Sequence, residues 1–247
     1  MPKIYLSPST QEWNPYVTGT GSEEYWMNLL ADELEPYLYA NTIAFVRNTP
    51  EMTAASSIAQ ANQLGGFDFY LALHSNASGA EQAGKNRGII VFYYPTSSEG
   101  KRAAELFAAQ LKKVYPLPDL VTTQSTTTLG EVRQPSCPAN LIEIAYHDNY
   151  ADARWIEGSL DVIAQAIARG LCDYFGLPFL YPQTPREGIV ATAGSPLLLR
   201  AYPSIDGEII GRIPNGASVE IYASYDGWYS VRYGETLGYA AQAYIIG

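Results

Sequence analysis

Short apolar runs alternate with longer amphipathic runs over residues 3–175. The short runs, which predict β-strands, are residues 3–6, 43–47, 67–73, 88–94 and 141–145. The long runs, which predict helices, are residues 22–38, 54–64, 98–114 and 151–175, with a break near Gly158. Strands that alternate with helices of this length predict an α/β domain with a mostly parallel, twisted sheet flanked by helices.

The pattern changes after residue 175. The stretch GLPFLYPQTP, residues 176–185, is rich in proline and glycine and is typical of a linker. Beyond it, short strand-like runs are separated by turn dipeptides, such as Asn-Gly at 215 and Asp-Gly at 226, which predict a small all-β, SH3-like barrel. The predicted organisation is a domain at 1–178, a linker at 179–187 and a second domain at 188–247.

Charge and composition exclude several classes of partner. The formal net charge is −10, and no basic stripe is present of the kind that binds nucleic acid or an anionic lipid surface. No apolar run approaches the roughly 20 residues of a membrane span, so membrane insertion is not expected. The first residues, MPKIYLSPS, lack the pattern of a signal peptide, which predicts either a trimmed chain or another export route. Cys137 and Cys172 are read as free thiols.

Polar clusters follow three of the predicted strands, at residues 7–11, 74–78 and 143–149. Ligands of open parallel sheets bind beyond the carboxyl ends of the strands, so these clusters predict a common site. The next helix opens with Glu23 and Glu24, and we expect Glu24 to point toward the strand ends, on the face it shares with Asn28.

Glu24 and His74 offer the oxygen and nitrogen ligands that zinc takes, and Glu143 offers a carboxylate that can accept a proton from metal-bound water. Plainer interpretations remain open. A histidine after a strand is often a structural hydrogen-bonding residue, and acidic residues in a first helical turn stabilise the helix dipole. Glu143 is harder to explain in this way, because a carboxylate within the apolar strand LIEIAY is costly unless it is paired or bound to metal.

Three motifs together resemble the zinc-dependent N-acetylmuramoyl-L-alanine amidases, which cut the bond between muramic acid and the stem peptide of peptidoglycan. They are the Glu24 and Asn28 pair, His-Ser-Asn-Ala at residues 74–77, and CPANLIEIAYHDN at residues 137–149. The resemblance covers residues 3–175. It implies one catalytic Zn²⁺ and peptidoglycan or muropeptides as the substrate.

The same resemblance implies that His74 and Glu24 are zinc ligands and that Glu143 is the general base. Asn76 would orient substrate or the surroundings of the metal, or would only cap the chain. Gln11 is the second candidate for a substrate-binding residue. His147, four residues after Glu143, is either a further ligand or a loop residue that caps the next helix.

One departure from the family concerns the first strand, which normally ends in Asp-Pro-Gly-His-Gly-Gly with a ligating histidine. Here the sequence is Ser-Pro-Ser-Thr-Gln at residues 7–11, without a histidine. Three alternatives follow: His147 supplies the missing nitrogen, Gln11 and waters complete a weaker site, or the protein has lost zinc and activity. In the last case it is an inactive, metal-free protein that binds cell wall or regulates its turnover.

Residues 188–246 resemble a bacterial SH3-type cell-wall module through LLLRAYPSIDGEIIGRIPNG, DGWYSVRY and GYAAQAYI. Trp228 is expected in its core, and Tyr202, Tyr225 and Tyr244 are candidates for a face that stacks on peptide or glycan. The resulting hypothesis is an extracytoplasmic, cell-wall-associated hydrolase with a wall-binding module. A hydrolase acting on another amide, such as a peptide bond, is a further alternative.

Overall fold

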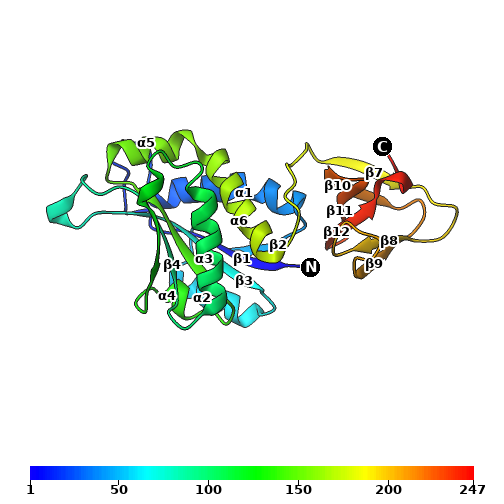
Figure 1. The fold of residues 1–247 in the computed structure, drawn as a ribbon, viewed down its shortest axis with the longest axis horizontal. Helices are drawn as coiled ribbons and strands as arrows, with labels where there is room; N and C mark the ends of the chain where they lie inside the picture. Colours follow the sequence, from blue (N-terminus) through cyan, green and yellow to red (C-terminus); the bar gives the residue numbers. More distant parts are fainter. The chain divides into compact units, whose positions relative to one another are not determined.

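The structure, a computed structural model, describes every residue of the chain from 1 to 247. The chain separates into two compact units. One consists of Lys3–Leu34 and Phe45–Phe175, and the other of Met1–Pro2, Glu35–Ala44 and Gly176–Gly247. Each unit contains one β-sheet, as the ribbon in Figure 1 shows.

The sheet of the first unit has six strands in the order β2-β1-β3-β6-β4-β5. The strands are β1 (Lys3–Pro8), β2 (Ala44–Arg47), β3 (Phe69–Asn76), β4 (Ile89–Tyr93), β5 (Val121–Ser125) and β6 (Ala139–Tyr146). β3 pairs in parallel with both β1 and β6, whereas β4 runs antiparallel to β6 and parallel to β5. The predicted α/β fold is confirmed, with one antiparallel step between β6 and β4.

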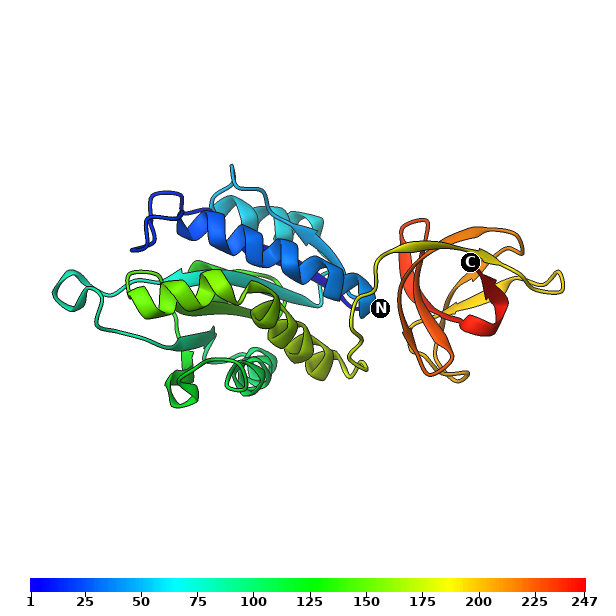
Figure 2. The ribbon, with the colours of Figure 1, turned by 90° about the horizontal axis from the view of Figure 1, so that it is seen from above.

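Helices lie on both sides of this sheet (Figure 2). They are α1 (Glu23–Ala40), α2 (Ala54–Leu64), α3 (Ser98–Leu111), α4 (Gly130–Arg133), α5 (Tyr150–Gly158) and α6 (Leu160–Phe175). The break expected near Gly158 separates α5 from α6, while α4 and strand β5 were not predicted. Short 3₁₀ helices occur at Ala80–Gln82, Pro118–Leu120 and Gln242–Tyr244. None of the helices has the length and apolar character needed to span a membrane.

Strand β3 presents its alternate residues to two different helical layers. Tyr70 and Ala72 belong to a core cluster that includes residues of α2 and α4. Phe69 is on the opposite face, where its ring lies 6.0 Å from Phe107 of α3 and 5.0 Å from Tyr174 of α6. Because side chains of a strand alternate between faces, the even-numbered residues of β3 face α2 and α4.

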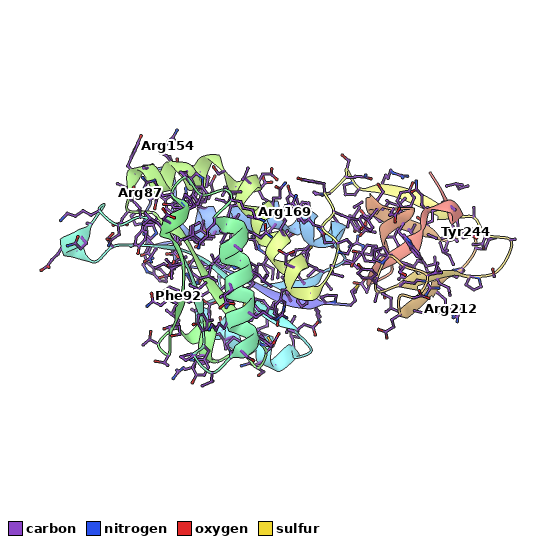
Figure 3. The ribbon with its side chains drawn as sticks, in the orientation of Figure 1. Arg87, Phe92, Arg154, Arg169, Arg212 and Tyr244 are labelled. Carbon is purple, nitrogen blue, oxygen red and sulfur yellow. The ribbon has the colours of Figure 1, made fainter.

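The chain that leaves β6 is held by Asp152 of α5, which is fully buried. Its carboxylate accepts hydrogen bonds from Arg87 Nε at 2.7 Å, from Tyr115 Oη at 2.7 Å, and from the backbone N–H groups of Gly88 and Tyr146. Arg87 is labelled in Figure 3. These bonds satisfy a buried charge and fix the loop that follows the strand carrying Glu143.

Both cysteines are free thiols, as predicted. Burial raises the pKa of the Cys137 thiol to about 11 and that of the Cys172 thiol to about 12. Since the thiolate is the form that attacks electrophiles and binds metal, neither side chain is a candidate for the chemistry of the site.

The second unit has seven strands in the order β13-β7-β10-β11-β12-β8-β9, and the pairs described are all antiparallel. The strands are β7 (Arg186–Val190), β8 (Leu197–Arg200), β9 (Ile209–Ile213), β10 (Ser218–Tyr225), β11 (Trp228–Tyr233), β12 (Thr236–Ala241) and β13 (Ile245–Ile246). Strand β7 thus begins inside the predicted linker. Asp226 and Gly227 both have positive φ and join β10 to β11, as the Asp-Gly dipeptide predicted. The all-β expectation is confirmed.

Candidate active site

The carboxyl ends of β1, β3 and β6 lie at one edge of the first sheet, beside a cavity of about 330 Å³. The register of β3 and β6 places His74 next to Glu143. The polar and aromatic residues that line this cavity include Ser9, Gln11, Trp13, His74, Glu131 and Glu143. Side chains from all three polar clusters predicted by the sequence therefore meet at this edge.

His74 lies between two carboxylates. Its Nδ1 is 2.8 Å from Glu23 Oε1, its Nε2 is 2.8 Å from Glu131 Oε2, and the residue is 8% exposed. Burial alone lowers the pKa of this imidazole, but the hydrogen bonds and charges of Glu131 and Glu23 outweigh burial and raise the pKa well above its usual value. The two carboxylates thus favour the protonated form of the imidazole.

Glu23 is the first residue of α1 and is almost fully buried. Its Oε2 accepts a 2.8 Å hydrogen bond from Asn14 Nδ2, and its Oε1 accepts one of 3.3 Å from Gln11 Nε2 in addition to facing His74. Burial raises the pKa of Glu23, but the hydrogen bond and charge of His74 outweigh it and leave the pKa below its usual value. Glu23 is thus a fixed carboxylate that points into the sheet edge.

Glu131 reaches the other nitrogen of His74 from α4 and is also buried. Sequence reasoning did not single it out, because GEVR carries no motif. A weak signal was available in the strands. Ser7 and Tyr70 place hydroxyls on the same face as His74, and buried hydroxyls need a polar partner.

Glu143 supplies a third carboxyl group from β6. Its Oε2 atom is buried and has no hydrogen-bond partner. Burial raises the pKa of this carboxyl to about 7, against the opposing charge of His74 and with a smaller contribution from the carboxylates Glu23 and Glu131. A carboxyl group with a pKa near neutrality is suited to accept and release a proton.

The carboxylate beside His74 is Glu23, whereas the sequence pointed to Glu24. Glu24 is partly exposed. Burial raises its pKa, and the charges of Glu12 and Glu51, which lie outside the site, raise it further. The physical reason is helical phase, since consecutive residues of a helix are rotated by about 100° and cannot share a face. Asn28, which suggested the Glu24 assignment, donates to the backbone oxygens of Ser9 and Glu24.

His147 does not join His74. Its Nδ1 lies 2.9 Å from the backbone oxygen of Ser75 and 3.1 Å from the Ser75 hydroxyl, and its ring stacks on Tyr16. Ser75 follows His74 on β3, so its side chain points to the opposite face of the sheet. The alternative in which His147 supplies a nitrogen to the site therefore does not fit the fold.

Two predicted substrate-binding residues have distinct surroundings. Gln11 Nε2 lies 3.3 Å from His74 Nδ1 and its Oε1 accepts a bond from Asn14, so Gln11 belongs to the cluster around His74. Asn76 Oδ1 accepts the backbone N–H of Ala77. This contact between Asn76 and Ala77 is local capping of the chain, which was one of the two roles expected for Asn76.

Zinc in proteins takes imidazole nitrogen and carboxylate oxygen ligands. His74 Nδ1 and Glu23 Oε1 provide one of each, and Gln11 can add an amide oxygen, because rotation of its side chain exchanges oxygen for nitrogen. No group of three or more His, Cys, Asp and Glu side chains is arranged to hold a metal ion. Both nitrogens of His74 are engaged by carboxylates, so the side chains present fall short of the three protein ligands of a catalytic zinc site.

Two family models match the chain. One described as N-acetylmuramoyl-L-alanine amidase matches residues 4–173, and one described as bacterial SH3 domain matches residues 195–246. No curated protein is significantly similar in sequence.

Solved structures share the fold of the first unit. The catalytic domain of the N-acetylmuramoyl-L-alanine amidase CwlV from Bacillus (Paenibacillus) polymyxa var. colistinus is 18% identical, with a TM-score of 0.62, covering 72% of this chain and all (100%) of that one. AmiC2 of Nostoc punctiforme is 17% identical, with a TM-score of 0.60, over 71% of this chain and 97% of that one. The N-acetylmuramoyl-L-alanine amidase from Clostridium difficile 630 is 19% identical, with a TM-score of 0.61, over 71% of this chain and 97% of that one.

Proposed function

The chain belongs to the N-acetylmuramoyl-L-alanine amidase family, which hydrolyses an amide bond of peptidoglycan, and we propose that it cleaves this bond between N-acetylmuramic acid and L-alanine with bound zinc. One observation carries the proposal: a nitrogen and a carboxylate oxygen, from His74 and Glu23, lie beside Glu143, whose Oε2 atom is buried and has no hydrogen-bond partner. His74 and Glu23 would be two of the ligands of a zinc ion, and Glu143 would be the base of the hydrolysis.

His74 and Glu23 would hold the ion, with Gln11 as the third donor. The chemistry that a zinc ion would supply there is polarisation of the amide carbonyl and activation of a water molecule. Glu143 accepts the proton of the attacking water and delivers it to the departing nitrogen of L-alanine. Burial raises the pKa of the Glu143 carboxyl to about 7, so the group is able both to take and to give the proton near neutral pH.

Asn76 is proposed to bind substrate through its amide nitrogen, since its oxygen is engaged with Ala77. Gln11 is proposed to contribute to binding as well as to the metal. Because the substrate is peptidoglycan, we infer that the protein acts outside the cytoplasm, at the cell wall.

Mass analysis of muropeptide digests tests the proposal. Release of a stem peptide with a free L-alanine amino group is expected, together with loss of release after treatment with a chelator and its recovery with zinc. Cleavage at another amide, such as a peptide bond within the stem, would contradict the proposed bond specificity.

The rival function is a metal-free, inactive protein that binds wall. This rival is favoured by two observations. Both nitrogens of His74 are hydrogen-bonded to carboxylates, and the second histidine, His147, does not lie beside it. Absence of zinc from the purified protein together with no product would establish this rival. Zinc with correct product would exclude it.

Trp13 is proposed to bind the N-acetylmuramic acid sugar of the substrate. It is 67% exposed and lines the cavity, and an exposed aromatic face there suits the apolar side of a sugar ring. We expect Trp13→Ala to raise KM for muropeptides about fivefold, equivalent to about 1 kcal/mol, with kcat little changed. Tyr150→Ala is the control, because Tyr150 is 65% exposed but does not line the cavity. Equal effects in the two variants would contradict a role for Trp13.

The second unit is proposed to hold the enzyme on the wall. Tyr244, labelled in Figure 3, lines a cavity of about 430 Å³ together with Trp228 and Arg200. Trp228, which was expected in the core, is half-buried: it packs against a core cluster of this unit and also borders the cavity. We expect Tyr244→Ala to weaken binding to purified cell walls about threefold to tenfold while turnover of a soluble muropeptide stays unchanged. Tyr225→Ala, at an exposed tyrosine outside this cavity, should bind like the wild type, and equal losses of binding and turnover would count against tethering.

A further inference from the structure

The cavity of about 430 Å³ in the second unit has one charged residue in its lining, Arg200. The lining also includes Ile205, Trp228 and Tyr244, and every residue that lines the cavity lies within residues 192–244. Ile205 is 78% exposed and Tyr244 is 50% exposed, so apolar surface is open to solvent beside a cation. Such a surface suits a ligand that combines a small apolar group with one negative charge.

Strand β8 ends at Arg200 and directs this side chain outward. Leu197 and Leu199 belong to the core cluster of the unit, so Leu198 and Arg200 lie on the outer face of the strand, where both line the cavity. The pairing of β8 with β9 shifts register between Leu199 and Arg200. A register shift of this kind bends a strand and re-aims the side chain that follows it.

One nitrogen of the Arg200 guanidinium group is held by the protein. Arg200 Nη1 donates a 2.6 Å hydrogen bond to the backbone oxygen of Gly207, in the turn that carries Ile205. No carboxylate of the protein pairs with Arg200. Because a guanidinium group has five N–H donors, most of them remain available for a ligand, while the bond to Gly207 fixes the group in advance and reduces the entropy cost of binding.

A second wall of the cavity, the loop at residues 192–196, is fixed as well. The backbone N–H and the hydroxyl of Thr192 donate to Asn215 Oδ1 at 2.8 Å and 3.2 Å. The N–H of Ala191 donates to the backbone oxygen of Tyr244, which joins this loop to the aromatic side of the cavity. The cavity therefore exists before a ligand binds.

We propose that this cavity binds a peptide by its terminal carboxylate, which pairs with Arg200, while Ile205, Trp228 and Tyr244 surround the short aliphatic side chain next to the carboxylate. The planar fork of a guanidinium group matches the two oxygens of a carboxylate. The inference rests on the proposed role of the second unit in holding the enzyme on the wall. Stem peptides of peptidoglycan that are not cross-linked end in the free carboxylate of alanine, so they present both groups that the cavity accommodates.

Other wall components fit this cavity less well. A neutral glycan would stack on the aromatic side chains but would leave the guanidinium group of Arg200 without a partner. A polymer of many phosphates needs several cations, whereas the protein has a net charge of −10 and the cavity offers one cation. A peptide with one terminal carboxylate requires only that one.

The test measures binding of two synthetic peptides to the full-length protein. Both are stem pentapeptides that end in D-alanine, one with a free carboxylate and one as the terminal amide. The indole N–H signal of Trp228 in ¹H–¹⁵N spectra reports this cavity rather than the one beside His74, and Trp228→Phe identifies the signal. We expect the peptide with the free carboxylate to shift the signal to saturation and the amide to bind about tenfold more weakly or less.

Arg200→Gln removes the positive charge and should weaken binding of the free carboxylate about tenfold, so that the two peptides bind alike. Arg212→Gln is the matched control. Arg212, labelled in Figure 3, is exposed on the neighbouring strand β9 and does not line the cavity. Its affinity for the peptide should stay within twofold of the wild type. Circular dichroism verifies that both variants are folded.

Affinities of the two peptides for the wild type that agree within twofold overturn the inference, and so does the absence of any response. This comparison needs no variant, so it holds even if Arg200→Gln does not fold. A Trp228 signal that responds to N-acetylglucosamine oligomers or to poly(glycerol phosphate) but not to the peptide also overturns it.

Retention of the wild type on purified cell walls separates this inference from the proposed tethering. A wild type that is retained on walls but does not distinguish the peptides keeps the tethering role and removes the carboxylate site. A wild type that prefers the free carboxylate but is not retained on walls contradicts tethering and supports the carboxylate site.

Discussion

Glu143→Gln is expected to lower kcat for muropeptide hydrolysis by about 10²-fold to 10⁴-fold, with little change in KM. The amide has nearly the size of the carboxyl group but cannot take the proton of the attacking water. Since the Oε2 atom of Glu143 has no partner in the free protein, the substitution breaks no existing hydrogen bond at that atom. Steady-state release of stem peptide, measured with zinc in excess, provides kcat and KM separately.

Glu24→Gln is the control for this experiment. Glu24 was the carboxylate first expected at the metal, but it is partly exposed and Glu23 lies beside His74 instead. We expect Glu24→Gln to keep kcat within about twofold of the wild type, as is usual for surface substitutions. If Glu143→Gln retained a third or more of the wild-type kcat, Glu143 would not be the base. A large loss in Glu24→Gln would restore that residue to the site.

The sheet edge that forms the site could be predicted from sequence because it depends on periodicity. Apolar runs mark the strands, and parallel strands bring their carboxyl ends together, which is sufficient to place His74 near Glu143. The family resemblance then supplied the chemistry. Strand β5, Val121–Ser125, was missed because its sequence, VTTQS, lacks an apolar run and four of its five residues are exposed.

The choice of ligands could not be predicted with the same accuracy, because it depends on phase. Glu23 and Glu24 are neighbours in the helix, yet only Glu23 points toward His74. Ser75 and His74 are neighbours in the strand, but their side chains lie on opposite faces, and His147 contacts Ser75. Glu131 lies 57 residues from His74 in sequence, and only the packing of α4 on the sheet brings the two together. Such a contact has no local sequence signal.

Glu143 also links the stability of the protein to pH. Burial raises the pKa of the folded carboxyl from an ordinary value of 4.5 to about 7, so the folded state binds this proton more tightly than the unfolded state. Above pH 7 the folded protein must ionise a buried group, whereas below pH 4.5 the group is neutral in both states. The contribution of Glu143 to stability is therefore lost as pH rises from 4.5 to 7.

In metal-free protein, Glu143→Gln should consequently increase the free energy of unfolding by up to about 3 kcal/mol at pH 8 and by nearly nothing at pH 4.5. Urea unfolding in the presence of a chelator, at several pH values, measures the difference between variant and wild type. Glu81→Gln, at an exposed carboxyl, should show no such trend. A difference independent of pH would mean that the glutamate is solvated or paired in solution. A difference that disappears when zinc is added would indicate that the ion stabilises the charged form of Glu143, which is the form the base needs.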